Sequence, residues 1–392
     1  MRWIRAFAML VAAATLISAV PAEACVSPPA PPAPPTGTVT IYNDTMFETH
    51  PAVSSGTGSL ADPYVIRDLV IRVRGTTGVR ISGTTAHFEV RNVTVVDEAG
   101  DASAYGSCCQ PGIELSSVQH GSVINSFLHG TQQGISVRYS SDVRLEGNVV
   151  EDAPSGLVLE GAEYATLRGN RVTNGSFVFT ARTTGEAASH TISEDNLVDG
   201  FPVLYRANCE GEILAHRALS YAIFGGCSVV AVSNLTIAPA HGRLQVLFSQ
   251  DVTITSSSLA GVAITQANRV TVTGSNIGYL QAEGFRDVSV LSSASIEGVP
   301  FVATAASGTG LRFEGNRFEG GARDMLQLGG IGFPYDCGCI PDRPDGAVRA
   351  AVVAGNEFRN TSRTAIQVYD APGAVIRNNT IVGAEYAIRG SD

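Results

Sequence analysis

Apolar residues recur along the chain in short alternating segments at a fixed interval. Gly134-Ile135-Ser136-Val137 recurs as Gly156-Leu157-Val158-Leu159 at a step of 22 in the numbering, and the same step leads back to Gly112-Ile113-Glu114-Leu115. In the middle of the chain the interval shortens to 18, and we count about 13 or 14 units. Alternation with a period of two is typical of β-strands, whereas no long stretch has a helical period. The pattern predicts an all-β repeat fold of short strands.

A polar residue stands at a constant position in each unit. The residue numbers of Gly134 and Asn148 differ by 14, as do those of Gly156 and Asn170, while Ser275 takes this place in a shorter unit. Asn tolerates left-handed backbone geometry and can hydrogen-bond to its equivalent one coil away. We therefore interpret these positions as a structural ladder at a turn. Three short strands in each unit predict a right-handed parallel β-helix whose coils are about 4.8 Å apart.

Two motifs carry a resemblance to a known group of proteins. Residues 56–66 read GTGSLADPYVI, and Gly-Asn turns recur at 147–148, 169–170, 315–316 and 355–356. They resemble the opening motif and the turns of secreted parallel β-helix repeat proteins with a pectin-lyase-like fold, including periplasmic NosD-like proteins and those with carbohydrate-binding and sugar-hydrolase (CASH) repeats. The resemblance covers about residues 56–390. It implies the fold but leaves the function open, because this fold hosts lyases, hydrolases, epimerases, adhesins and accessory proteins.

The N-terminus has the pattern of an export signal. Arg2 and Arg5 precede an apolar run at 6–20, and residues 22–24 read Ala-Glu-Ala, a pattern typical of signal-peptide cleavage. We expect a signal peptide over 1–24 and a secreted or periplasmic product. Because Cys25 directly follows the cleavage site, a lipid anchor at Cys25 is the alternative. No later segment has the roughly 18 apolar residues of a membrane span.

The rest of the chain divides into three predicted parts. Six Pro residues between 28 and 35 predict an extended linker over 25–36. An N-terminal cap segment is expected over 37–62, and the β-helix domain over 63–392. The register of the repeat returns in phase after each insertion, which predicts one uninterrupted solenoid rather than two domains.

Composition excludes several classes of function. The chain has 26 basic and 36 acidic residues, for a net charge of −10, and every basic residue is Arg. A chain without Lys cannot form a Schiff base or a P-loop. An acidic chain without a basic block is a poor nucleic-acid binder, so we expect no nucleic-acid partner.

Insertions into the repeat mark where a site could lie. The first falls between Asn92 and Gly112, and the second, which is longer, falls between Asn316 and Asn356. A smaller insertion lies near 182–190. Loops on a rigid scaffold often carry function, so we expect the loops 97–111 and 331–345 to contact any ligand, although they could instead cover the core.

Six cysteines follow Cys25: Cys108, Cys109, Cys209, Cys227, Cys337 and Cys339. Disulfides are the default in an exported protein. Cys209 and Cys227 are separated by a step of 18 and are nearly in phase, so adjacent coils would bring them together. Cys108-Cys109 and the Cys337-Gly-Cys339 pair could each close a small ring or bind a soft metal such as copper. These alternatives stay open.

One cluster of charged and aromatic residues is a candidate glycan-binding patch: Arg138, Tyr139, Arg144, Arg168 and Arg171. Asp142, Glu146, Glu151 and Asp152 lie among them. Pectate lyases combine an acidic calcium cluster with a catalytic Arg, so calcium is a second possible cofactor. Opposite charges interleaved on a solvent-facing sheet would give the same pattern.

Motifs of known enzymes with this fold are missing from the sequence. There is no paired Asp, His241-Gly242 is not preceded by Gly, and no Asp-Pro-His-Asp occurs. The first hypothesis is therefore a monomeric, non-catalytic exported protein that binds a polysaccharide or a cell-surface or periplasmic protein. The alternative is a polysaccharide lyase, hydrolase or epimerase that acts on an acidic glycan.

Overall fold

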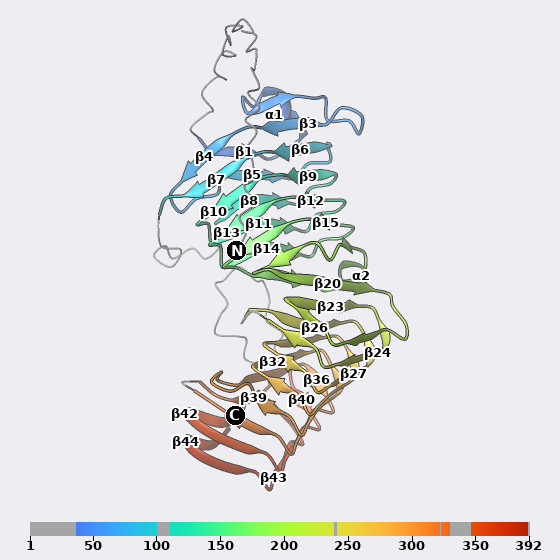
Figure 1. Ribbon diagram of the computed structural model, residues 1–392, viewed down its shortest axis with the longest axis vertical. Helices are drawn as coiled ribbons and strands as arrows, with labels where there is room; N and C mark the ends of the chain where they lie inside the picture. Colours follow the sequence, from blue (N-terminus) through green and yellow to red (C-terminus); the bar gives the residue numbers. More distant parts are fainter. Residues whose placement is uncertain (1–36, 100–109, 239–240, 322, 330–345, 391–392) are drawn as a thin grey trace, which may run out of the picture. The chain divides into compact units, whose positions relative to one another are not determined.

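Each repeat unit is one coil of three short parallel strands, and consecutive coils pair through hydrogen bonds (Figure 1). The computed structural model describes residues 37–99, 110–238, 241–321, 323–329 and 346–390, which belong to one unit, Pro34–Asp392. The fold is an all-β right-handed solenoid of about 14 coils, as the sequence predicted. Within the described residues two short helices interrupt it, α1 (Asp44–Thr49) and α2 (Thr184–Ala188).

The strand register confirms both repeat lengths. Ile135 pairs with Ile113 on one side and with Leu157 on the other, which is a step of 22 in the numbering. In the middle of the chain Val270 pairs with Val252 and Val288, a step of 18. Side chains along these strands alternate between the interior and the outer face, so the register keeps like residues stacked in the core.

The coils form two stacks, and the first has three sheets. Its first sheet consists of β1 (Val39–Ile41), β5 (Val79–Ser82), β8 (Pro111–Ser116), β11 (Gln133–Arg138), β14 (Ser155–Glu160) and β17 (Phe177–Thr180). Its second sheet consists of β2 (Val53–Ser55), β3 (Tyr64–Arg67), β6 (Phe88–Arg91), β9 (Gly121–Ile124), β12 (Arg144–Glu146), β15 (Thr166–Arg168) and β18 (Thr191–Ile192). Its third sheet consists of β4 (Val70–Val73), β7 (Thr94–Asp97), β10 (Phe127–His129), β13 (Val149–Glu151), β16 (Arg171–Thr173) and β19 (Leu197–Val198).

The second stack also has three sheets. The fourth sheet contains β20 (Phe201–Ala207), β23 (Tyr221–Gly225), β26 (Arg243–Leu247), β29 (Val262–Thr265), β32 (Tyr279–Glu283), β35 (Val302–Ala306) and β39 (Leu326–Leu328). The fifth contains β21 (Ile213–Ala215), β24 (Ser228–Ser233), β27 (Gln250–Thr255), β30 (Asn268–Thr273), β33 (Arg286–Leu291), β36 (Gly308–Thr309), β37 (Arg312–Glu314), β40 (Val348–Arg349), β41 (Val352–Ala354) and β43 (Val375–Arg377). The sixth contains β22 (Ala218–Leu219), β25 (Thr236–Ile237), β28 (Ser258–Leu259), β31 (Asn276–Ile277), β34 (Ala294–Ser295) and β38 (Arg317–Glu319); β42 (Glu357–Val368) and β44 (Thr380–Gly390) continue both the sixth and the fourth.

A buried ladder of Asn and Ser side chains joins the coils at one turn. The Asn170 Oδ1 accepts hydrogen bonds from the backbone N–H and the Nδ2 of Asn148, and the Asn170 Nδ2 donates to the Leu145 carbonyl and to the Asn196 Oδ1. Ser257, Ser275 and Ser293 continue the same pattern in the second stack, followed by Asn316, Asn356 and Asn379. The predicted structural role is confirmed.

The predicted left-handed geometry of the ladder Asn is wrong. The positive φ falls one residue earlier, at Gly147 (64°) and Gly169 (61°), whereas Asn148 and Asn170 are absent from the positive-φ residues. The preceding residue makes the left-handed turn, and this turns the Asn side chain inward between two coils. Gly is favoured at the preceding position because it has no Cβ to clash with the backbone.

The parallel stacking is interrupted between the two stacks, which was not predicted from the sequence. Asp199 and Gly200 both have positive φ, and they reverse the chain so that β20 pairs antiparallel with β19. Both faces of β20 are then buried: Tyr205 packs into the core of the first stack, whereas Leu204 packs into the core of the second.

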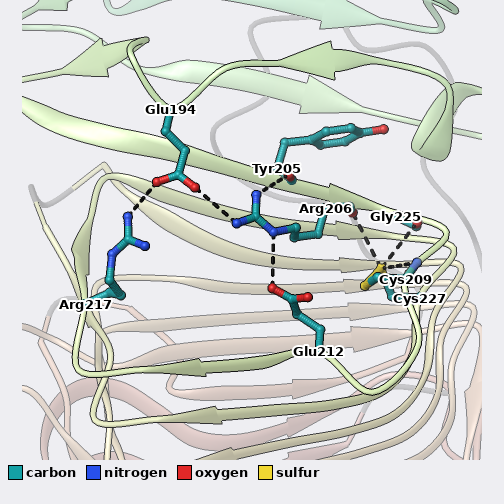
Figure 2. A network of polar contacts seen from close by, with 8 residues as sticks. All are labelled: Glu194, Tyr205, Arg206, Cys209, Glu212, Arg217, Gly225 and Cys227. Atoms are coloured by element: carbon teal, nitrogen blue, oxygen red, sulfur yellow. Dashed lines mark hydrogen bonds and ion pairs between the residues drawn. A yellow bond between two sulfur atoms is a disulfide. The ribbon is translucent and has the colours of Figure 1, made fainter.

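Polar contacts join the two stacks at this point, and a disulfide between Cys209 and Cys227 links the first two coils of the second stack (Figure 2). Glu194, in the turn between β18 and β19, accepts hydrogen bonds from Arg206 (3.1 Å) and Arg217 (2.7 Å) of the second stack. These two guanidinium groups lower the pKa of Glu194, with Arg217 as the larger cause. Arg206 also donates to Glu212 (3.1 Å). These ion pairs of Arg206 and Arg217 are partly exposed, so they help to orient the first coil of the second stack but contribute little to its stability.

The ladder yields a first prediction. Replacing Asn170 with Ala should lower the free energy of unfolding by roughly 3 kcal/mol, because buried partners such as the Leu145 carbonyl lose their hydrogen bonds. Urea unfolding monitored by circular dichroism measures this change. Asn276→Ala is the matched control: its side chain is exposed and has no hydrogen bond among the described residues, so a change below about 0.5 kcal/mol is expected. Equal effects of both substitutions would contradict a special role of the ladder.

Candidate functional site

The structure places the five predicted patch residues on three sheets. Arg138 ends β11 of the first sheet, and Tyr139 follows it. Arg144 and Arg168 lie on β12 and β15 of the second sheet, and Arg171 lies on β16 of the third. The structure therefore brings Arg138 and Tyr139 together, places Arg144 and Arg168 on the outer face of the second sheet, and turns Arg171 to the third. Arg144 is paired with Glu146 on its own strand.

Arg138 and Tyr139 belong to a cluster at the corner between the first and second sheets. The Glu160 carboxylate, which is nearly buried, lies 3.3 Å from the Arg138 Nε and accepts a hydrogen bond from the Tyr139 hydroxyl at 3.1 Å. Arg182 approaches from the start of α2: its guanidinium carbon lies 5.4 Å from the centre of the Tyr139 ring, and its Nη2 donates to the Tyr139 hydroxyl at 3.3 Å. Cation–π contact and hydrogen bonds together fix the ring.

The same corner carries a column of side chains through the preceding and following coils. The rings of His87 and His120 are stacked with centres 4.3 Å apart, and the His120 Nδ1 lies 2.7 Å from Asp142. Tyr164 occupies the equivalent turn position one coil later and is exposed. We name Arg138, Tyr139, Glu160, Tyr164, Arg182, His87, His120 and Asp142 the corner surface. Within it, His120, Asp142 and Tyr164 take the same turn position in consecutive coils, which are about 4.8 Å apart.

Helix α2 is held against the corner by buried polar contacts. His190 lies just beyond the helix; its Nδ1 accepts from the Ala165 N–H (3.1 Å), and its Nε2 lies 2.7 Å from the Glu186 carbonyl. The ring is therefore neutral, with the proton on Nε2. The Tyr205 hydroxyl donates to the Ala187 carbonyl at 2.8 Å. Burial lowers the pKa of His190 to about 4 and raises the pKa of Tyr205 to about 12.

The corner surface combines rings with more carboxylates than guanidinium groups. Glu186 accepts from the Arg182 N–H, and the Glu163 carboxylate lies beside Gly185 of α2. Both guanidinium groups, those of Arg138 and Arg182, lie within 4 Å of the Glu160 carboxylate, and the Glu163 and Glu186 carboxylates lie nearby along α2. Desolvation lowers the pKa of His87, and the neighbouring His120 lowers it further. Exposed rings beside charged hydrogen-bonding groups suit a polar ligand with apolar faces, but the charge does not favour an anion.

Glu160 and Arg182 are not among the site residues predicted from the sequence. The sequence feature that could have indicated Arg182 is the smaller insertion at 182–190. This insertion forms α2 and brings Arg182 to Tyr139, which is far away in the chain. Glu160 stands one repeat after Arg138 and pairs with it in the strand register. The repeat length alone would have identified this neighbour.

The structure contains a disulfide between Cys209 and Cys227, whose Cα atoms are 4.5 Å apart. These are the cysteines that the repeat phase placed on adjacent coils. Cys25, Cys108, Cys109, Cys337 and Cys339 lie outside the described residues, as do most of the loops 97–111 and 331–345. The copper hypothesis for Cys337 and Cys339 therefore stays a prediction. In the part of the chain that the structure describes, no three His, Cys, Asp or Glu side chains are placed to hold a metal ion.

Comparison with protein families identifies one match. The model described as "Right handed beta helix region" matches residues 53–215 and 220–391. None of the curated proteins compared matches the chain. Among the described residues, no helix is long and apolar enough to cross a membrane.

Three solved structures share a similarity with this chain at low identity. PfbA, a surface adhesin of Streptococcus pneumoniae, is 9% identical, with 83% of this chain and 86% of that chain covered and a TM-score of 0.26. The alginate lyase AlyF-OU02 in complex with G6 is 12% identical, with 89% and 78% covered and a TM-score of 0.22. The catalytic domain of a GH87 α-1,3-glucanase in complex with nigerose is 9% identical, with 94% and 70% covered and a TM-score of 0.20. These similarities are too low to support an argument about function.

The buried His190 yields a prediction of pH dependence. The unfolded chain binds the proton near pH 6.5 and the folded chain near pH 4. The stability associated with neutral His190 is therefore complete above about pH 6.5 and is lost as the pH falls toward 4, by roughly 3 kcal/mol. Thermal melts between pH 7 and 4 measure it. His190→Gln should flatten the pH dependence, whereas His241→Gln, at an exposed position, should not. Parallel curves for wild type and His190→Gln would contradict the assignment.

Proposed function

The chain belongs to the family of right-handed β-helix proteins, and we propose that it is an exported, non-catalytic protein that binds a polysaccharide along the corner surface. The observation that carries this proposal is the pair of exposed tyrosines of the corner surface: Tyr139, whose ring contacts Arg182 and whose hydroxyl binds the nearly buried Glu160, and Tyr164 one coil later. Sugar rings have apolar faces that stack on aromatic rings and hydroxyl groups that bind carboxylates and guanidinium groups.

The linear arrangement of the corner surface favours a polymer over a single sugar. Consecutive coils repeat the position of His120, Asp142 and Tyr164 along the direction in which the coils stack. An extended polysaccharide lying along this direction would meet one side chain per coil. Because the nearby carboxylates outnumber the guanidinium groups, a neutral polysaccharide fits better than the acidic glycan expected from the sequence.

Export supports this role. The predicted signal peptide over 1–24 and linker over 25–36 would place the folded part outside the cytoplasm, where polysaccharides lie. A disulfide between Cys209 and Cys227 is compatible with an oxidising compartment. A lipid anchor at Cys25 would hold the same surface near a membrane.

One observation favours catalysis as the second candidate function. Glu283 lies on the outer face of β32, and burial raises the pKa of its carboxyl. Among the described residues the Glu283 carboxyl has no hydrogen bond or ion pair. Tyr279 and Gln281 lie on the same strand face, with 2.9 Å between the Tyr279 hydroxyl and the Gln281 Oε1. A carboxyl whose pKa is raised by burial could act as a general acid on a glycosidic bond.

Binding measurements on a panel of polysaccharides test the proposal. Affinity electrophoresis and calorimetry with neutral glucans, xylans and mannans, and with acidic alginate and polygalacturonate, should show binding to at least one neutral polymer. Tyr164→Ala and Arg182→Gln should each weaken it about tenfold or more, a loss of about 1.4 kcal/mol. The matched controls are Ile213→Ala and Arg377→Gln, exposed side chains on the fifth sheet.

Two outcomes would contradict the proposal. Equal losses for the corner variants and the controls would place binding elsewhere. Release of new reducing ends or unsaturated sugars from any polymer would make the protein an enzyme, and loss of that activity in Glu283→Gln would identify the acid.

A further inference from the structure

Four side chains of the corner surface occupy equivalent positions in consecutive coils: His87, His120, Asp142 and Tyr164. The register of the strands that follow each corner aligns each of these side chains with the next. We name the four residues the corner column. The column is about 14 Å long, because it spans three coil steps of about 4.8 Å.

Insertions into the repeat limit the corner column at both ends. In the four coils that form it, the corner between the first and second sheets is short: 83–87, 117–120, 139–143 and 161–165. In the coil before them residues 42–63 separate β1 from β3, and in the coil after them residues 181–190 separate β17 from β18. The two insertions contain α1 and α2, which lie at opposite ends of the first stack (Figure 1).

The first insertion occupies the position before His87. The Gly58 carbonyl accepts a hydrogen bond from the His87 N–H at 2.9 Å. Leu60, in the tight turn that follows, is 80% exposed, so this turn protrudes from the surface. The Asp44 carboxylate of α1 accepts a hydrogen bond from the Thr85 N–H at 3.0 Å and holds the insertion against the first coil of the column.

The second insertion occupies the position after Tyr164. The Ser189 hydroxyl oxygen accepts a hydrogen bond from the Tyr164 N–H at 3.0 Å. Arg182, at the start of this insertion, is exposed and reaches back to the Tyr139 hydroxyl. The corner column is therefore an open stretch of four coils between two protruding segments.

We propose that the corner surface recognises a neutral segment of about four consecutive sugars, one for each coil of the column. This inference rests on the proposed binding of a polysaccharide at the corner surface. Each sugar of an extended polysaccharide advances the chain by a distance similar to the coil spacing. A longer chain loses contact with the column where the Leu60 turn or α2 protrudes, so its further sugars add no contacts.

The two ends of the corner column differ in chemistry. At one end the exposed Tyr164 ring can stack on a sugar, and the insertion adds Arg182. At the other end the rings of His87 and His120 are stacked on each other. Among the described residues the ring nitrogens of His87 have no hydrogen-bond partner, so they can bind a sugar hydroxyl. Because aromatic stacking also removes apolar surface from water, a short oligosaccharide should occupy the Tyr164 end first.

Oligosaccharides of defined length test the proposal on the full chain. The probes are the disaccharide to the octasaccharide of the neutral glucan, xylan or mannan that binds most tightly, each titrated by calorimetry. The affinity should increase several-fold with each sugar up to about four sugars. For longer probes it should increase only by the statistical factor for the number of ways in which a longer chain can be placed on four positions.

A variant at each end of the column shows which sugars make contact there. Tyr164→Ala should weaken binding of the disaccharide and the tetrasaccharide alike, about tenfold or more. His87→Ala should weaken binding of the tetrasaccharide about threefold or more and leave the disaccharide unchanged, because the disaccharide does not reach His87. Unchanged disaccharide binding also shows that the His87→Ala variant is folded. The matched control is His216→Ala, at an exposed position in the second stack, which should affect neither probe.

Two results would overturn the proposal while leaving polysaccharide binding in place. The first is an affinity that is already constant from the disaccharide onward, or that still increases several-fold per sugar up to the octasaccharide. The second is an effect of His87→Ala that is absent, or that is the same for both probes. If no neutral polymer binds, or if Tyr164→Ala changes binding of no probe, the proposed function itself is wrong and this inference is wrong with it.

Discussion

Hydrogen bonds between consecutive coils are the interaction on which the whole structure depends. Each coil is too short to bury its own apolar side chains, so its core exists only when a neighbouring coil covers it. The backbone pairing sets the spacing, and the buried ladder through Asn148, Asn170 and Asn196 adds side-chain hydrogen bonds at one turn. An Asn fits this position because its amide can accept from one coil and donate to another at the same time.

This constraint also explains where function can lie. Side chains that point inward are committed to the core, so chemistry is left to the outer faces, the turns and the insertions. At the corner surface a rigid turn holds Tyr139 and Tyr164, and the insertion that forms α2 adds Arg182. The buried contacts of His190 and Tyr205 fix that insertion against both stacks. The fold therefore sets the geometry of the corner surface, and the insertion that forms α2 supplies Arg182.

The repeat made much of the fold predictable, and the limits of that prediction are physical. The length of the repeat and the alternation of apolar and polar residues specify which side chains stack on one another. Ile113, Ile135 and Leu157 were therefore correctly placed in one column. The chain reversal at Asp199-Gly200 was missed because it depends on two local backbone angles that no periodicity encodes. The patch residues were grouped by their closeness in the chain, but every coil turns through three faces. Arg138 and Arg171 therefore lie on different sheets.

Hydrogen–deuterium exchange followed by mass spectrometry tests the central role of the coil-to-coil bonds most directly. Peptides containing the ladder amides of Asn148, Asn170 and Asn316, whose N–H groups bind the next coil, should exchange slowest, at rates close to that of global unfolding. The exposed turn around Gly298 should exchange within the shortest labelling time. Ladder peptides that exchange as fast as this turn would contradict the account.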